Sequence, residues 1–127
     1  MKFIKFFGNK VRKKDVYFKY STEEQFTGEY WINGVKIYCK VILVTGFDSK
    51  DKYVPHNISD LYRVLSCDLF MKISDGTNHM MPRAHKDDDH DGISIQITKT
   101  NLILQVGQSN SFQNATGYAI LKYIKTT

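Results

Sequence analysis

Apolar and polar residues alternate along much of the chain, which predicts β-strands. The clearest pair of such runs covers residues 26–32 and 35–44, and Asn33-Gly34 separates them. Asn-Gly between two strand-like runs favours a type I′ hairpin turn, because both central residues of that turn take positive φ. We expect one set of alternate residues in the second run to face the core: Val35, Ile37, Cys39, Val41 and Leu43.

A longer strand is predicted from about Arg63 to Ile73, where apolar residues alternate up to the turn-forming residues 74–78. Before this strand, Ser59 or Asp60 could cap a single helical turn through residues 61–62. A longer helix would conflict with the strand pattern that follows it.

A second hairpin is predicted within residues 93–106, where alternating isoleucines, a turn at 99–101 and an aliphatic run follow one another. The final strand, 116–125, places four side chains on one face: Tyr118, Ile120, Lys122 and Ile124. Short strands separated by turns at this spacing are typical of antiparallel sandwiches. The sequence therefore predicts an all-β, jelly-roll-like antiparallel β-sandwich, with residues 20–127 as a single domain and residues 1–19 as a basic N-terminal arm.

The net charge of +5 is concentrated at the start of the chain. Residues 1–20 hold seven Lys/Arg against one acidic residue, whereas the rest holds eleven Lys/Arg against twelve acidic residues. A nucleic-acid surface would interleave its basic residues with aromatics on one face of the domain, so a nucleic-acid partner is not favoured. A basic arm more often docks on an acidic partner or is simply solvated.

The two cysteines, Cys39 and Cys67, lie in strand-like runs without metal-binding spacing, and we expect two reduced thiols. No apolar run has the length of a membrane span, and the start lacks the pattern of a signal peptide. We therefore expect no membrane partner and synthesis in a reducing cytoplasm.

An acidic cluster matches the opening of a calcium-binding loop, with carboxylates at alternate positions before Gly92: Asp87, Asp89 and Asp91. The match then fails, because the twelfth loop position is Thr98 rather than the glutamate that binds the ion. We expect a solvated acidic loop and no cofactor, with calcium binding as the alternative. No nucleophile lies near a suitable base in sequence, so no catalytic residue is predicted and the protein is not expected to be an enzyme.

Aromatic residues gather around the first hairpin at Tyr30, Trp31 and Tyr38. They could form a sugar- or protein-binding surface, because flat aromatic faces stack on both kinds of ligand. Cross-strand packing is the commoner use of such residues, and we favour it for Trp31.

Four segments resemble a widespread bacteriophage domain: residues 20–25, 28–40, 55–58 and 118–127. The family pattern reads Y-S-T-x-E, then W-I-D/N-G-K-x-I/L-Y-x-K, then P-H-x-I, and closes with E-Y-T-K-T. This chain departs from it at a few positions, with Val35 and Lys36 for Lys and Pro, Cys39 for a polar residue, and Lys122 and Ile124 for Glu and Thr. None of these changes breaks the strand pattern.

The resemblance implies a virion structural protein of the tail or fibre apparatus, made in the bacterial host cytoplasm and assembling with other tail, portal or fibre proteins. It also implies a homo-oligomer, with a trimer favoured. Since the pattern begins 20 residues from Met1, we expect the domain to stand without a fibre shaft before it. The arm then becomes the candidate for docking on a neighbouring protein, through Lys2, Phe3, Phe6, Phe7, Lys10, Arg12, Lys13 and Lys14. An extra edge strand with a solvated lysine run is the alternative.

Recognition by such a domain would use loops on a rigid scaffold. The candidate loops are 57–62, 75–79, 83–91 and 108–113, and the candidate binding residues are Asn57, Tyr62, Asn78, His79, His85, Gln108 and Asn110. Their ligand would be a glycan on the host surface, which makes a carbohydrate- or receptor-binding module the alternative function. A depolymerase is a third hypothesis, which would require paired carboxylates in one cleft.

Overall fold

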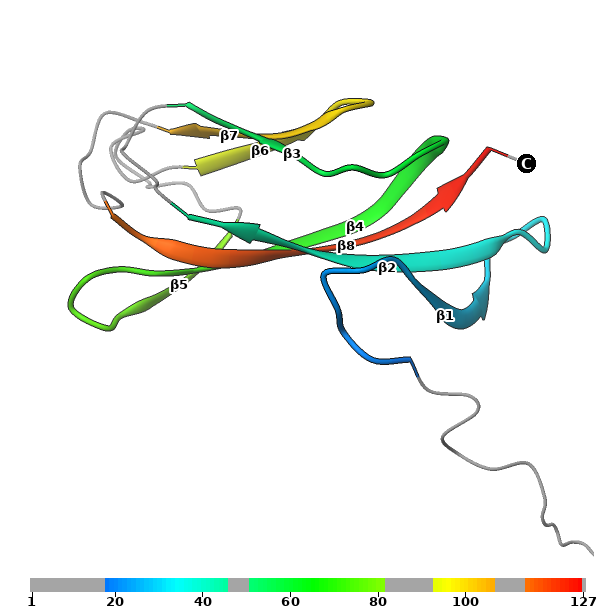
Figure 1. Ribbon diagram of the computed structural model, residues 1–127, viewed down its shortest axis with the longest axis horizontal. Helices are drawn as coiled ribbons and strands as arrows, with labels where there is room; N and C mark the ends of the chain where they lie inside the picture. Colours follow the sequence, from blue (N-terminus) through cyan, green and yellow to red (C-terminus); the bar gives the residue numbers. More distant parts are fainter. Residues whose placement is uncertain (1–17, 46–50, 82–92, 107–113, 127) are drawn as a thin grey trace, which may run out of the picture.

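The structure is a computed structural model that describes residues 18–45, 51–81, 93–106 and 114–126. These residues form eight strands and no helix, and every strand pairing is antiparallel. Two sheets pack face to face (Figure 1). This arrangement confirms the predicted all-β antiparallel sandwich, and the jelly-roll-like strand order stays a prediction. Within the described ranges no helix is available to cross a membrane.

The larger sheet has five strands, and the strand latest in the sequence lies at its centre. Its order is β1 (Gln25–Tyr30), β2 (Lys36–Val44), β8 (Thr116–Lys125), β4 (Leu61–Lys72) and β5 (Asn78–Met81). β8 pairs with β2 on one side and with β4 on the other. Both ladders run along most of β8, which makes this strand the main element of the sheet.

The smaller sheet has three strands, in the order β3 (Lys52–Pro55), β7 (Asn101–Val106) and β6 (Ile93–Ile97). β6 and β7 form the hairpin that the alternation over residues 93–106 predicted. The inward residues of both sheets form one core, which contains Ile42, Val44, Leu69, Met71, Ala119, Leu121, Tyr123, Ile93, Leu102 and Leu104.

The inward face of β2 differs from the prediction. β2 pairs with β8 without a bulge, and the side chains that point between the sheets are Tyr38, Lys40, Ile42 and Val44. The predicted set faces outward, and Leu43 in that set is exposed. The pattern was misleading because the Tyr38 ring stacks on Tyr123 inside the sandwich and the Lys40 ammonium binds a backbone carbonyl there. Cys39, by contrast, is buried on the outer face.

Residues 18–24 run beside β2 and account for this second buried face. The backbone N–H of Val41 donates to the carbonyl of Ser21 at 2.9 Å. Lys122 of β8, the register partner of Cys39, places its ammonium over the Phe18 ring. A strand covered on both faces loses the simple alternation of apolar and polar residues.

The first hairpin turn is also different from the prediction. Only Gly34 of the Asn33-Gly34 pair has positive φ, at 78°. The Trp31 carbonyl accepts a hydrogen bond from Gly34 N–H, and Trp31 N–H donates to the Val35 carbonyl, both at 2.8 Å. These bonds define a three-residue loop, in which a turn is followed by a glycine in the left-handed region. The type I′ turn is therefore wrong, although the hairpin itself is confirmed.

No helical turn precedes β4. Residues 59–60 form a tight turn in which Asp60 has a φ of 57°, and the strand begins at Leu61. The Asp60 carbonyl accepts a hydrogen bond from Thr126 N–H at 2.8 Å, which fixes the turn to the end of β8. The predicted capping role of Ser59 or Asp60 is wrong because the backbone reverses direction there and enters a strand.

Both cysteines are free, as predicted. Cys39 is paired with Lys122 and Cys67 with Leu121, so the two thiols lie on either side of β8. Two strand spacings of roughly 4.8 Å exceed the Cα separation that a disulfide spans. Burial raises the pKa of the Cys39 thiol, and burial together with Asp68 raises the pKa of the Cys67 thiol to about 11.

Candidate functional site

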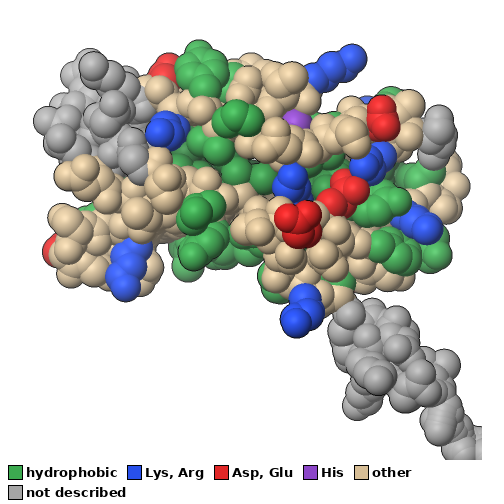
Figure 2. All heavy atoms as spheres, viewed as in Figure 1, with side chains coloured by type: hydrophobic (Ala, Val, Ile, Leu, Met, Phe, Trp, Pro, Cys, Tyr) green, Lys and Arg blue, Asp and Glu red, His purple; other side chains and the backbone are tan. Residues whose placement is uncertain are grey.

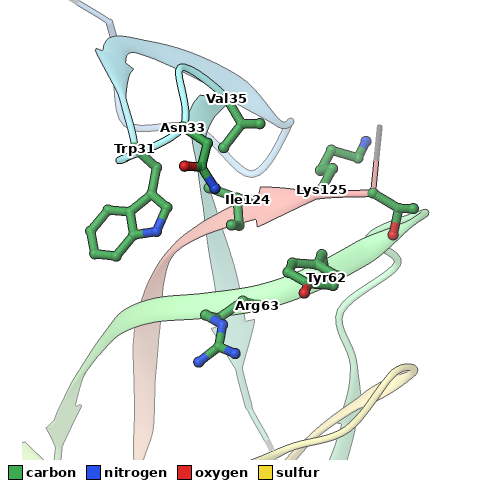
Figure 3. A pocket seen from close by; sticks show the side chains of 8 residues that line it. Trp31, Asn33, Val35, Tyr62, Arg63, Ile124 and Lys125 are labelled. Carbon is green, nitrogen blue, oxygen red and sulfur yellow. The ribbon is translucent and has the colours of Figure 1, made fainter.

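A recess with a volume of about 420 Å³ opens at one end of the larger sheet (Figure 3). It is lined by Trp31, Asn33, Val35, Tyr62, Arg63, Ile124, Lys125 and Thr126. Its volume is within the range of small-molecule binding sites. The mixture of aromatic, amide and cationic side chains makes it the best candidate for a ligand site among the described residues.

Three segments far apart in sequence build the recess. The three-residue hairpin loop presents Trp31 and Asn33, the start of β4 presents Tyr62 and Arg63, and the end of β8 supplies Ile124. Figure 3 shows the Asn33 amide pointing from the loop toward Ile124, with Trp31 to one side and Tyr62 and Arg63 beyond. Arg63 and Ile124 are register partners, so the pairing of β4 with β8 fixes their separation.

The rim of the recess is aromatic and its floor is aliphatic. Trp31 is 38% exposed and Tyr62 is 65% exposed, whereas Ile124 is buried. Trp31 is therefore partly exposed at the recess, and the cross-strand packing that we favoured for it stays a prediction. Tyr38 does form such a pair, since its ring stacks on Tyr123 with centroids 6.2 Å apart.

The two cations of the recess differ in their partners. Lys125 Nζ lies 3.0 Å from Glu24 Oε1 and donates more weakly to Ser59 Oγ at 3.4 Å. Arg63 has no ion pair with any residue of the described ranges. Since no Asp or Glu lines the recess, Arg63 leaves its positive charge available to a ligand.

Behind the recess, Glu24 joins the segment before β1 to β8. Its Oε2 accepts a 2.6 Å hydrogen bond from the Tyr123 hydroxyl, and its Oε1 binds Lys125. Burial, followed by the hydrogen bond to Glu24, raises the pKa of Tyr123 well above its usual value. The Lys125 ammonium also lies 5.4 Å from the centroid of the Tyr38 ring. These contacts hold the end of β8 in place.

The raised pKa of Cys67 predicts a loss of stability at high pH. The unfolded thiol ionises near pH 9.0 and the folded one near 11. This contribution is complete below the unfolded value and is lost as pH rises toward the folded one, because the thiolate forms more readily in the unfolded chain. Urea unfolding across this window should give a steeper loss of stability for the wild type than for Cys67→Ala. Parallel curves for the two proteins would contradict the assignment.

His56 connects the two sheets from the segment after β3. Its Nδ1 accepts a 3.1 Å hydrogen bond from Ile58 N–H, so Nε2 carries the hydrogen that it donates to the Thr98 carbonyl at 2.9 Å. Lys40 Nζ, from β2, donates to the carbonyl of His56 at 2.8 Å and to that of Asn57 at 3.3 Å. His56 is thus a buried structural residue that binds the segment before β4 to the β6–β7 turn.

A second surface of interest is the outer face of the larger sheet. Apolar side chains from β2, β4 and β8 line a shallow hollow there with residues 20–22: Val41, Phe70, Tyr118 and Ile120. Figure 2 shows hydrophobic side chains gathered on the underside of this sheet. Asp68 and Lys72 flank Phe70 on the same face of β4. The outer face therefore combines apolar area with opposite charges.

The structure separates the predicted binding residues that it describes. Asn57 and Tyr62 lie before and at the start of β4, whereas Asn78 and His79 lie on β5, where they pair with Lys72 and Met71 at the other end of β4. Tyr62 and the His79 partner Met71 are nine residues apart on β4, which corresponds to about 30 Å at roughly 3.3 Å per residue. Only Tyr62 belongs to the recess, and the Asn57 carbonyl instead binds Lys40.

Several predicted residues lie outside the described ranges. They are the binding candidates His85, Gln108 and Asn110, the metal candidates Asp87, Asp89 and Asp91, and the docking candidates Lys2, Phe3, Phe6, Phe7, Lys10, Arg12, Lys13 and Lys14. Across residues 18–45, 51–81, 93–106 and 114–126, no three His, Cys, Asp or Glu side chains are placed to hold a metal ion.

Sequence reasoning missed the contribution of Arg63, Ile124 and Asn33 to the recess. Arg63 and Ile124 were assigned to strands, and Asn33 to a turn, on the basis of local patterns. The pairing of Arg63 with Ile124 across β4 and β8 brings two of these residues together, and it cannot be read from either segment alone. No protein-family model, curated protein or solved structure matches this chain.

Proposed function

We propose that this chain is a bacteriophage virion structural protein of the tail or fibre apparatus, assembling as an appendage or adaptor subunit with other virion proteins. The observation that carries the proposal is that residues matching the phage pattern meet in two groups of interior contacts. Lys40 binds the His56 carbonyl in the first. The second consists of Glu24, Tyr38, Tyr123 and Lys125. Proteins that share a fold are expected to share the residues whose contacts stabilise it, and these pattern residues make such contacts. In this role the protein is made in the host cytoplasm and resides in the virion.

The same proposal assigns the protein a contact role rather than a catalytic one. Both thiols have raised pKa values because of burial, so they are poorly suited to nucleophilic attack. The recess offers aromatic, amide and cationic groups, which favour binding. A β-sandwich with such a recess is compatible with a subunit that binds neighbouring virion proteins or a receptor.

Copies of the chain are proposed to meet through the outer face of the larger sheet, in a homo-oligomer that the phage resemblance implies is a trimer. Tyr118 is 52% exposed there beside the apolar hollow. Covering such a surface removes apolar area from water, which is the main driving force for subunit association. The opposite charges of Asp68 and Lys72 on this face favour contact with another copy rather than repulsion.

Quantitative mass spectrometry of purified particles tests the proposal. The protein should be present in wild-type particles at a copy number divisible by three. In phage that encode Tyr118→Asp, the protein should be lost from the particles, because a charge would be placed in the subunit contact.

The matched control is Tyr53→Asp, which changes an equally polar and 61% exposed tyrosine on β3 of the smaller sheet. This variant should still be incorporated. Absence of the wild-type protein from particles would overturn the virion assignment. Equal incorporation of the two variants would leave that assignment standing and reject the outer face as the subunit contact.

A second candidate function is carbohydrate or receptor binding for host attachment, and the recess favours it. Protein sites for sugars present aromatic faces with a few polar groups, and Trp31, Tyr62 and Asn33 supply both. Such a role is compatible with a virion location, because an appendage subunit can also contact the host surface.

A further inference from the structure

The recess combines a stacking surface with an apolar floor. Trp31 and Tyr62 stand exposed at the rim, and Ile124 closes the bottom. The apolar faces of sugar rings pack on aromatic side chains of this kind, while ring hydroxyls need hydrogen-bond partners. Asn33 and Thr126 line the same recess and supply an amide and a hydroxyl.

The charge of the recess narrows the ligand class. Its lining includes Arg63 and Lys125 and no acidic residue. Glu24 already neutralises Lys125, whereas Arg63 lacks an ion pair among the residues described. A guanidinium binds a carboxylate or phosphate through two parallel hydrogen bonds. An anionic ligand should therefore bind the recess with higher affinity than a neutral one.

We propose that the recess binds an acidic saccharide, a sugar that carries a carboxylate or a phosphate. Trp31 stacks on the sugar ring, Arg63 pairs with the anionic group, and Asn33 and Thr126 bind hydroxyls. This inference rests on the second candidate function, carbohydrate binding, and adds the chemical class of the ligand. It assigns specificity to Arg63, a residue of the sheet rather than of a loop.

Trp31 is the single tryptophan of the chain, so its fluorescence reports on the recess directly. The full chain is titrated with sialyllactose as the carboxylate probe, with glucose phosphate as the phosphate probe, and with lactose and glucose as their neutral counterparts. We expect saturable changes in emission with at least one acidic probe. The two acidic probes distinguish a carboxylate from a phosphate as the preferred group. The neutral sugars should bind at least about tenfold more weakly, since hydrogen bonds to charged groups are the stronger ones.

Arg63→Gln tests the anion contact without altering the buried core. It should weaken binding of the acidic probe by about tenfold or more and abolish most of the salt dependence of that binding. Lys19→Gln is the matched control, because it removes an exposed cation that lies before β1 and does not line the recess. This control should bind the acidic probe as the wild type does. Circular dichroism checks that both variants remain folded.

Three results would overturn the inference: no response to either acidic probe, equal affinity for acidic and neutral sugars, or unchanged affinity in Arg63→Gln. Equal affinity would leave carbohydrate binding standing and reject only the acidic class. Absence of response to all four sugars would reject the recess as a site for these sugars. The virion proposal would be unaffected in each case, because it is tested separately by particle composition.

Discussion

Gly117→Ala is expected to lower the free energy of unfolding by about 3 kcal/mol, because it overfills the centre of the larger sheet. A Cβ atom at this position of β8 would overlap the backbone carbonyl oxygen of Phe70 and lie 2.7 Å from Met71 Sδ. Phe70 belongs to β4, whose ladder holds it between β8 and β5. The clash falls on backbone that hydrogen bonds fix on both sides, so relaxation would disturb two ladders.

Urea unfolding of Gly117→Ala beside Gly76→Ala measures this effect. Gly76 has a φ of 92° and open space around it, so an alanine there is strained by about 1–2 kcal/mol without a clash. Gly117 should be the more damaging site although its φ is outside the positive range. If Gly76→Ala cost as much as Gly117→Ala, close approach of β4 and β8 would not be the reason for the glycine.

His56→Ala is expected to lower the free energy of unfolding by about 2–4 kcal/mol. The change removes the partners of Ile58 N–H and of the Thr98 carbonyl and leaves a cavity at a position that is 1% exposed. A buried donor without a partner costs more than the net value of a normal hydrogen bond. The segment between β3 and β4 should loosen first.

His79→Ala is the matched control, because it removes the same side chain from the edge strand β5, where it is only half-buried. Its cost should be about 1 kcal/mol or less. Equilibrium unfolding gives both values, and hydrogen exchange at the Ile58 amide reports on the local loss. A protected Ile58 amide in His56→Ala would argue against the structural role of the imidazole.

Local alternation was enough to predict most strands and both hairpins. Residues 93–106 read as a hairpin because the isoleucines of β6 alternate with polar residues and a turn separates them from the aliphatic run of β7. β2 could not be read in this way. Residues 20–22 cover part of its outer face. On the inner face, Lys40 buries its stem while its ammonium binds the His56 carbonyl, and the Tyr38 ring stacks on Tyr123. Which side chains of β2 point into the core thus depends on contacts with residues that are distant in the sequence.

The candidate site was only partly predictable for a related reason. Trp31 and Tyr62 were noticed as a hairpin aromatic and a loop residue, because exposed aromatics are visible in a sequence. Arg63 and Ile124 meet through the pairing of β4 with β8, across about half the chain. The tight turn at residues 59–60 and the bulges of β4 set that register, and these depend on backbone conformations that local propensities do not specify.

The phage-like pattern was more informative about the scaffold than about a ligand. Its members Lys40 and His56 meet between the sheets, and Glu24 meets Tyr123 and Lys125. None of these contacts needs a partner molecule. Tyr62 and Arg63 line the recess and lie outside the pattern, so they are where proteins with the same scaffold could differ in specificity.

The central position of β8 has a consequence for synthesis of the protein. β2 and β4 leave the ribosome long before residues 116–125, yet each needs β8 as a hydrogen-bonding partner. The nascent chain therefore carries open strand edges until nearly the whole domain has been translated. Non-local pairing of this kind slows folding and leaves edges prone to aggregation. Formation of the larger sheet is thus a late step that follows translation of its last strand, even though the β6–β7 hairpin can form earlier.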